Sequence, residues 1–220
     1  MQRKISNYLK KNSSIKKLSF LLFPPRCVIC GNRTNGRNIC ENCFKKIDFL
    51  DYPLIEHRKN VFFYAITNYE GVSGELVRSL KFRKLKSVSS DIAEIFADFI
   101  QRNNIKARFL TFVPMTPKER KSRGFNQSRL IARHLSQILN LELLSSLKKI
   151  KETKKQVGLL RRERIKNVKN AFIAEKIPTS GNVIIIDDVY TTGATAHSVA
   201  KVISLKTDSN IYFIAFSRKI

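Results

Sequence analysis

Hydrophobic residues recur along the chain in short runs that alternate with longer amphipathic stretches. Four runs are rich in branched or aromatic residues and have the length of buried strands. They comprise residues 61–66, 109–113, 183–186 and 211–216. Apolar side chains at helical spacing predict helices as well. These cover residues 75–86, 91–102, 128–139 and a stretch that begins near Gly193. Because strands alternate with helices, the pattern predicts an α/β domain built on a parallel sheet.

The run Val183–Ile186 is followed at once by polar residues. Asp187 and Asp188 fall at its carboxyl end, where open α/β sheets bind their ligands. A small hydroxylated loop comes next and consists of Thr191, Thr192, Gly193, Ala194 and Thr195. Its N–H and hydroxyl groups, at the positive end of the predicted helix, suit a phosphate. Two carboxylates beside such a loop fit sugar hydroxyls or a divalent cation. A phosphorylated-sugar site is therefore favoured over a solvated Asp-Asp turn.

The stretch 183–195 resembles the phosphoribosyl pyrophosphate (PRPP) motif of type I phosphoribosyltransferases. The resemblance implies that Asp187 and Asp188 contact the ribose hydroxyls of Mg-PRPP. It also implies that residues 191–195 enclose the 5-phosphate. PRPP and Mg²⁺ are thus the expected small ligands. The pattern designates neither a catalytic side chain nor an acceptor substrate.

A basic loop is predicted between the strand 109–113 and the helix 128–139. Such a loop at the carboxyl edge of the sheet can close over a diphosphate and exclude water. Its candidate contacts are Arg120, Arg123, Gly124, Asn126 and Gln127. Lys81, within Leu80-Lys81-Phe82, is a further candidate diphosphate contact. For each cation alone, a solvated surface charge is the alternative, and only their clustering favours a function.

Charge changes this picture, because Lys and Arg number 42 against 17 acidic residues and give a formal net charge of +25. Such an excess is typical of proteins that bind nucleic acid. Compositional drift in an AT-rich genome is the alternative, although drift does not by itself suppress Asp and Glu. A transferase that acts on small molecules has no need of this charge, so the composition favours a polyanionic partner.

The four cysteines form two Cys-x2-Cys pairs, Cys27/Cys30 and Cys40/Cys43. Two such pairs complete the tetrahedral four-sulfur shell that zinc prefers, and a site closed in this way is structural. An iron–sulfur cluster and a redox dithiol pair are the alternatives. The nine residues between the pairs are fewer than a common ribbon spacing. Phe44 beside the last ligand is either a platform for stacking bases or a core residue.

The apolar run Leu18–Phe23 has six residues, too few for the core of an export signal, and no run approaches a membrane span. We therefore expect a cytoplasmic protein with reduced cysteines and no membrane span. Its expected organisation is a basic, helical segment over 1–22, the zinc module over 23–50 and the main domain over 60–220. Residues 44–60 are expected to form a connector.

Several segments together resemble the ComF family, in that family's order. They are the cysteine module, residues 80–82, residues 123–127, and Gln156 with Leu159, Leu160, Arg164 and Asn167. The resemblance implies a type I phosphoribosyltransferase-like domain preceded by a zinc module, acting in DNA uptake during natural transformation. It implies single-stranded DNA and PRPP as partners, together with a competence helicase or another DNA-processing protein. An active phosphoribosyltransferase and a PRPP-responsive adaptor remain alternatives. His57, His134 and His197 are given no role.

Overall fold

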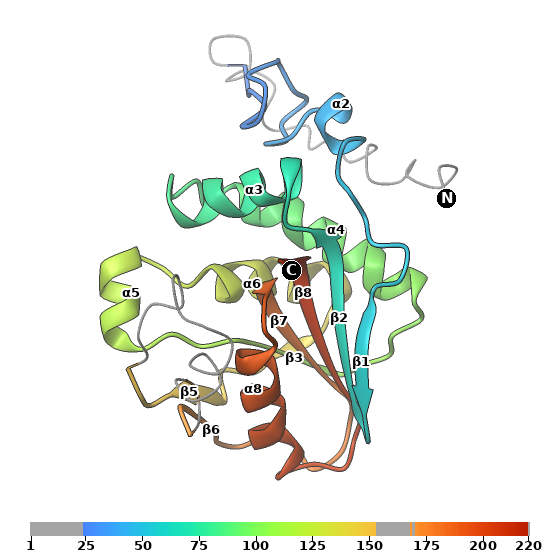
Figure 1. The fold of residues 1–220 in the computed structure, drawn as a ribbon, viewed down its shortest axis with the longest axis vertical. Helices are drawn as coiled ribbons and strands as arrows, with labels where there is room; N and C mark the ends of the chain where they lie inside the picture. The colour runs from blue at the N-terminus through green and yellow to red at the C-terminus, as the bar shows by residue number, and fades with distance from the viewer. Residues whose placement is uncertain (1–23, 153–167, 169, 220) are drawn as a thin grey trace.

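The computed structural model describes residues 24–152, 168 and 170–219 (Figure 1). Six strands form one sheet in the order β1-β2-β8-β7-β3-β4. They are β1 (Leu54–Arg58), β2 (Val61–Asn68), β3 (Phe109–Phe112), β4 (Glu142–Leu143), β7 (Val183–Tyr190) and β8 (Ile211–Arg218). Only the pairing of β1 with β2 is antiparallel within this sheet. The predicted α/β fold with a mostly parallel sheet is confirmed.

The two faces of the sheet are covered by different helices, and β7 contributes to both cores. Ile184 and Ile186 point into the core that holds α3 (Gly71–Lys81), α4 (Val88–Arg102) and α6 (Gln127–Leu139). Ile185 points to the other face, against α8 (Ala194–Ser204) and the hairpin of β5 (Leu147–Lys149) and β6 (Phe172–Ala174). Since successive side chains of a strand alternate between faces, the unbroken apolar run at 183–186 suits a strand buried on both sides.

The connections that follow β3 and β7 leave the sheet toward opposite faces. After β3 the chain continues into α6, which packs against the same face as α4. After β7 it enters α8 on the other face. Because β3 and β7 are neighbours, a crevice is expected beyond their carboxyl ends, at the point where open α/β sheets bind ligands. Asp187 and Asp188 lie at that end, although β7 continues past them to Tyr190 and does not stop at Ile186 as predicted.

Most predicted elements are present, with shifted ends. The helices α6 and α8 begin within one residue of the expected positions. By contrast, α3 starts at Gly71 and stops at Lys81, so both its ends come earlier than those of the predicted helix 75–86. Lys84 adopts a φ of +57°, which no helix can continue through. The connector predicted over 44–60 contains the edge strand β1.

The predicted basic loop contains the short helix α5 (Pro117–Arg123). Thr116 accepts a hydrogen bond from the Glu119 N–H group, and the Glu119 carboxylate accepts one from the Thr116 N–H group. This reciprocal capping box, with Pro117 in the first turn, starts the helix. Gly124, with a φ of +88°, ends it. The sequence Thr-Pro-Lys-Glu carries this start signal, and interpreting the segment as a loop was wrong.

The cysteine module packs against α4 and lies at the top of Figure 1, next to α3 and α4. Its short helix α2 (Glu41–Phe44) contributes Cys43 and Phe44 to the core shared with α4. Asn38 donates from its side chain to Asp91 Oδ2 at 2.6 Å and accepts from the Ser87 hydroxyl at 2.6 Å. Burial raises the pKa of Asp91, in spite of the hydrogen bonds from Asn38.

Among the described residues, no helix combines the length and the apolar character needed to cross a membrane. The basic segment expected over residues 1–22 lies outside the described residues. So do Gln156, Leu159, Leu160, Arg164 and Asn167 of the second half of the ComF-like pattern.

Candidate functional site

Two helices bring polar side chains to the acidic pair on β7. Lys81, the last residue of α3, places its Nζ 2.8 Å from Asp188 Oδ1. Ser128 on α6 donates its hydroxyl to Asp187 Oδ1 at 3.0 Å, and the Asp188 N–H group donates to the same oxygen at 2.9 Å. Lys81 therefore lies beside both carboxylates, more than 100 residues away in sequence. Ser128 was not identified from the sequence, where it is one of many serines without a motif.

The two carboxylates differ in their surroundings. Asp188 is 8% exposed and pairs directly with Lys81. Asp187 is half-buried, and its removal from water, together with the charge of Asp188, raises its pKa to about 7. Lys81, the Asp188 N–H group and the Ser128 hydroxyl oppose that rise without cancelling it. A cation or a set of sugar hydroxyls placed between these carboxylates would relieve their repulsion.

The loop after β7 has a backbone conformation and a close packing that require glycine at its turn. Gly193 has a φ of +76° and caps α8, whose first N–H groups lack partners within the helix. A Cβ at Gly193 would lie 2.4 Å from Tyr190 Oη and 3.1 Å from His197 Cδ2. Only glycine therefore fits this conformation and this space. The residues from Thr191 to Thr195 thus present small groups at the carboxyl end of β7, directly after the acidic pair.

His197, to which the sequence assigned no role, anchors α8 to the sheet. Its Nε2 lies 3.1 Å from Glu56 Oε2 on β1, and its ring centroid lies 4.6 Å from that of Phe63 on β2. Burial lowers the pKa of His197, whereas the Glu56 carboxylate raises it. The contact fixes the first turn of α8, and with it the position of Gly193. This role was not visible from spacing, because β1 itself was not predicted.

The candidates on the basic segment fall into two groups. Asn126 is buried, donates to the Val113 carbonyl at 2.9 Å and accepts from the Arg129 N–H group, so it caps α6. Gln127 is fully buried in the first turn of α6, next to Ser128. Arg120 and Arg123 are exposed on α5. Among the described residues, neither arginine contacts the acidic pair.

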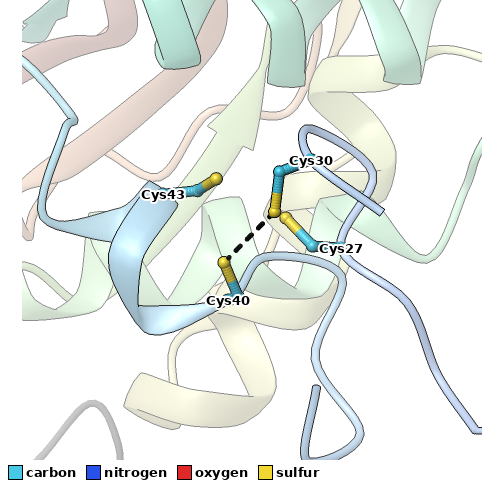
Figure 2. Close-up of side chains that lie close together, drawn as sticks. All are labelled: Cys27, Cys30, Cys40 and Cys43. Carbon is cyan, nitrogen blue, oxygen red and sulfur yellow. Dashed lines mark hydrogen bonds between the residues drawn. The ribbon is translucent and has the colours of Figure 1, made fainter. Parts of the chain in front are cut away.

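The four cysteines converge on one point (Figure 2). All four Sγ atoms lie within 4.8 Å of one another, and those of Cys30 and Cys40 are 3.6 Å apart. Zinc bonds to sulfur at about 2.3 Å, so a tetrahedral four-sulfur site needs Sγ atoms about 3.8 Å apart. Gly31, with a φ of +77°, closes the turn of the first pair. The donor set and its spacing fit a structural zinc ion.

The two buried cysteines of the cluster differ in their pKa values. Burial and the neighbouring cysteine side chains raise the pKa of Cys43. Burial raises the pKa of Cys27, but the N–H groups of Cys30, Cys40 and Ile29 outweigh burial and bring it to about 7. Phe44, beside the last ligand, is 5% exposed and packs with its centroid 6.1 Å from that of Phe49. Phe44 is a core residue, so its alternative role as a base-stacking platform is wrong.

The chain is similar to several known proteins. Residues 18–54 match the family described as "Double zinc ribbon domain". The chain is 27% identical to "Competence protein ComFC" of Bacillus subtilis over 80% of this chain and 70% of that protein. It is 26% identical to "Competence protein F" of Haemophilus influenzae over 81% of this chain and 78% of that protein. The chain is a homologue of the ComF-type competence proteins.

A further relative is "DNA utilization protein YhgH" of Escherichia coli, which is 31% identical over 63% of this chain and 64% of that protein. The matched family is described as a double ribbon. This chain has four cysteines in all, which is enough for one four-sulfur site. The ComF-type resemblance seen in the sequence is therefore confirmed, and its zinc module is supported both by the family match and by the cysteine geometry.

Solved phosphoribosyltransferases are also similar to this chain. Adenine phosphoribosyl transferase from Trypanosoma brucei matches with a TM-score of 0.45 and 10% identity, over 78% of this chain and 87% of that chain. The enzyme from Leishmania tarentolae matches with a TM-score of 0.44 and 10% identity, over 76% of this chain and 94% of that chain. Both likenesses are distant, and the α/β fold itself is established by the strand order above.

Proposed function

We propose that this chain is a cytoplasmic protein of natural transformation that binds single-stranded DNA and carries a Mg-PRPP site. The excess of 42 basic over 17 acidic residues is the observation that carries the DNA role. The candidate sugar-phosphate site uses only one of these cations in its described contacts, Lys81. The remaining positive charge suits a phosphate backbone. The names of the relatives, which concern competence and DNA utilization, support the same role.

The cysteine module contributes some of this charge. Arg37 and Lys45 pair with Glu94 and Glu41, at 3.1 and 2.8 Å. Arg33 and Lys46 are exposed, and among the described residues no carboxylate pairs with either of them. We therefore assign the module a share of the DNA contact through phosphates rather than through base stacking, since Phe44 is buried.

A salt titration tests the DNA role. We expect fluorescence anisotropy to show binding of a labelled single-stranded oligonucleotide whose log affinity falls linearly with log salt over about 0.05–0.3 M. Duplex of the same sequence should bind more weakly. The doubly substituted Cys27→Ser/Cys30→Ser variant should lose affinity, because the module's cations are no longer held in place. Binding that is absent, or equal for both forms of DNA, would reject the proposal.

The Mg-PRPP site is supported by the contacts around Asp187 and Asp188. Their carboxylates supply the oxygen ligands that Mg²⁺ prefers, directly or through water, and the bound ion would neutralise the diphosphate. Lys81 pairs with Asp188 here, and its ammonium group can pair with a diphosphate oxygen instead when the ligand binds. The N–H groups at the start of α8 face the position expected for the 5-phosphate.

Asp188→Asn tests this assignment by calorimetry. A hydrogen bond to a charged group contributes about 1.5–3 kcal/mol, so we expect the affinity for Mg-PRPP to fall by about tenfold or more. Asp98→Asn is the matched control, because Asp98 pairs with Arg102 on the exposed side of α4. Equal affinities of the wild type and Asp188→Asn would remove Asp188 from the site.

The same preassembled site favours a second candidate function, an active phosphoribosyltransferase. In that reaction a nucleophile displaces diphosphate from the anomeric carbon, and the protein has only to position the reactants and stabilise charge. No covalent residue is needed. Release of diphosphate from Mg-PRPP in the presence of one nucleobase or amine, and its loss in Asp188→Asn, would establish this activity.

A further inference from the structure

The connection between α3 and α4, residues 82–86, combines an exposed aromatic side chain with positive charge. Phe82 is 70% exposed and Leu85 is 37% exposed. Lys81, Arg83, Lys84 and Lys86 surround them. Of these, Arg83 pairs with Glu75 at 2.6 Å and Lys81 with Asp188 at 2.8 Å. A solitary exposed apolar residue is ordinary on a protein surface. An exposed phenylalanine beside Lys84 and Lys86, with which no carboxylate pairs among the described residues, is a different kind of surface.

This connection is held at both ends. At its start, the Phe82 N–H group donates to the Arg78 carbonyl at 2.8 Å, and the Leu85 N–H group donates to the Ser79 carbonyl at 3.1 Å. At its end, Asn38 of the cysteine module binds Ser87 through two hydrogen bonds, at 2.9 and 2.6 Å. The backbone that carries Phe82 is therefore fixed, and the ring is displayed to solvent by the fold.

A second basic element lies next to this connection. Lys86 Nζ lies 5.4 Å from the centroid of Phe125, in the segment that joins α5 to α6. Figure 1 shows α5 on the same side of the molecule as the C-terminal end of α3. The exposed cations of α5 are Lys118, Arg120, Lys121 and Arg123. Among the described residues, no carboxylate pairs with Lys84, Arg120 or Lys121, so their charge remains available to a polyanion.

We propose that the α3–α4 connection and α5 form the contact for single-stranded DNA, with Phe82 stacking on a base and the surrounding cations binding phosphates. This inference rests on the DNA role proposed above and assigns that role a surface. Aromatic side chains among cations are the means by which proteins bind single strands without reading sequence. A single strand is favoured over duplex because the faces of paired bases are covered by their neighbours, whereas an unpaired base can lie against the ring.

The proposed DNA surface lies next to the acidic pair of β7. Phe82 follows Lys81 directly, and Lys81 pairs with Asp188 at 2.8 Å. The DNA contact therefore borders the candidate sugar-phosphate site, and the same stretch of backbone serves both. The other half of the surface also borders this site. Phe125 and α5 precede α6 in the chain, and Ser128 of α6 donates a hydrogen bond to Asp187.

Paired substitutions test the surface in the full-length protein. Stacking on one base is worth about 1–3 kcal/mol when measured by alanine substitution, which corresponds to about 5- to 150-fold in affinity. We expect Phe82→Ala/Lys84→Ala to weaken binding of a single-stranded oligonucleotide by at least about tenfold. The matched control is Leu205→Ala/Lys206→Ala. Leu205 is 73% exposed beside a lysine at the other end of α8 from Gly193, and this variant should bind as the wild type does.

A fluorescence measurement separates stacking from a merely structural effect. The chain contains no tryptophan, so Phe82→Trp introduces a single reporter. We expect this variant to keep wild-type affinity and its emission to be quenched by single-stranded DNA. Leu205→Trp, at the control site that is 73% exposed at the C-terminal end of α8, should show no quenching.

The outcomes separate this inference from the proposed function. If the wild type binds single-stranded DNA but Phe82→Ala/Lys84→Ala binds equally well, only the surface is wrong. The same holds if DNA leaves the Phe82→Trp emission unchanged. If the wild type does not bind, the DNA role itself fails and the surface fails with it. Equal quenching by single-stranded RNA would retain the surface and widen its partner to single-stranded nucleic acid.

Discussion

Removal of zinc should lower the thermal stability of the whole described fold, and not only unfold the cysteine module. Cys27, Cys43 and Phe44 belong to the same core as α4, so loss of the metal opens that core to water. Structural zinc in small modules binds with about 10–16 kcal/mol of apparent free energy, and 1 kcal/mol shifts Tm by about 2–4 °C in a chain of this size. We expect Tm to fall by at least about 10 °C when a strong chelator is added, measured by circular dichroism.

Controls identify the metal and the ligands. Zinc added after removal of the chelator should restore Tm. In the Cys27→Ser/Cys43→Ser variant, which starts from the lower Tm, the chelator should have no further effect. Elemental analysis should find about one zinc ion per chain, as expected for a single four-sulfur site. Iron in the purified protein, with visible absorption that the chelator abolishes, would favour an iron–sulfur cluster. An unchanged Tm would contradict a structural metal.

Gly193→Ala should abolish Mg-PRPP binding at the concentrations that saturate the wild type. The new Cβ would lie 2.4 Å from Tyr190 Oη, at a backbone φ of +76°. The loop must move to relieve this contact, and the first N–H groups of α8 then no longer converge on one phosphate. Since several charge-assisted hydrogen bonds are lost together, at about 1.5–3 kcal/mol each, we expect affinity to fall by at least about 100-fold in calorimetry.

Gly71→Ala is the matched control for backbone strain. Gly71 has a φ of +57°, and no heavy atom lies within 4 Å of the position of a Cβ. Its substitution should cost stability without changing the affinity for Mg-PRPP. Conversely, Tyr190→Phe removes the oxygen that a Cβ at Gly193 would meet most closely, so adding it to Gly193→Ala should restore part of the binding. Full affinity in Gly193→Ala alone would show that the loop does not hold the phosphate.

Local patterns were sufficient to predict the centre of the sheet and the helix after it. The run Val183–Ile186 is apolar on both faces, and Gly193 precedes regular helical spacing, so β7 and α8 could be recognised from adjacent residues. The edge strand β1 could not, because Leu54–Arg58 is short, mostly polar and stabilised by pairing with β2. The helix α5 was missed for another reason. Its capping box was present, but the density of charge favoured a loop.

Contacts between distant segments were beyond any local pattern. The pairing of Lys81 with Asp188 depends on α3 ending at Lys81, whereas spacing predicted a helix that continued to residue 86. The same early end exposes Phe82, which periodicity had placed within a helix. The sequence allows Phe44 to be either a base-stacking platform or a core residue of the cysteine module, and the packing of the module decides between them. The module buries Phe44 by sharing the core of α4.

The strand order bears on how the protein is made. β8, the last described strand, lies between β2 and β7, and it is paired with both over most of its length. A ribosome must therefore synthesise residues 211–218 before the two halves of the sheet can join. Until then β2 and β7 each present an unpaired, apolar edge of the kind that pairs with other chains. A chain truncated before Ile211 keeps its cysteines, its acidic pair and its phosphate loop, yet it would be expected to aggregate rather than to act as a smaller version of the protein.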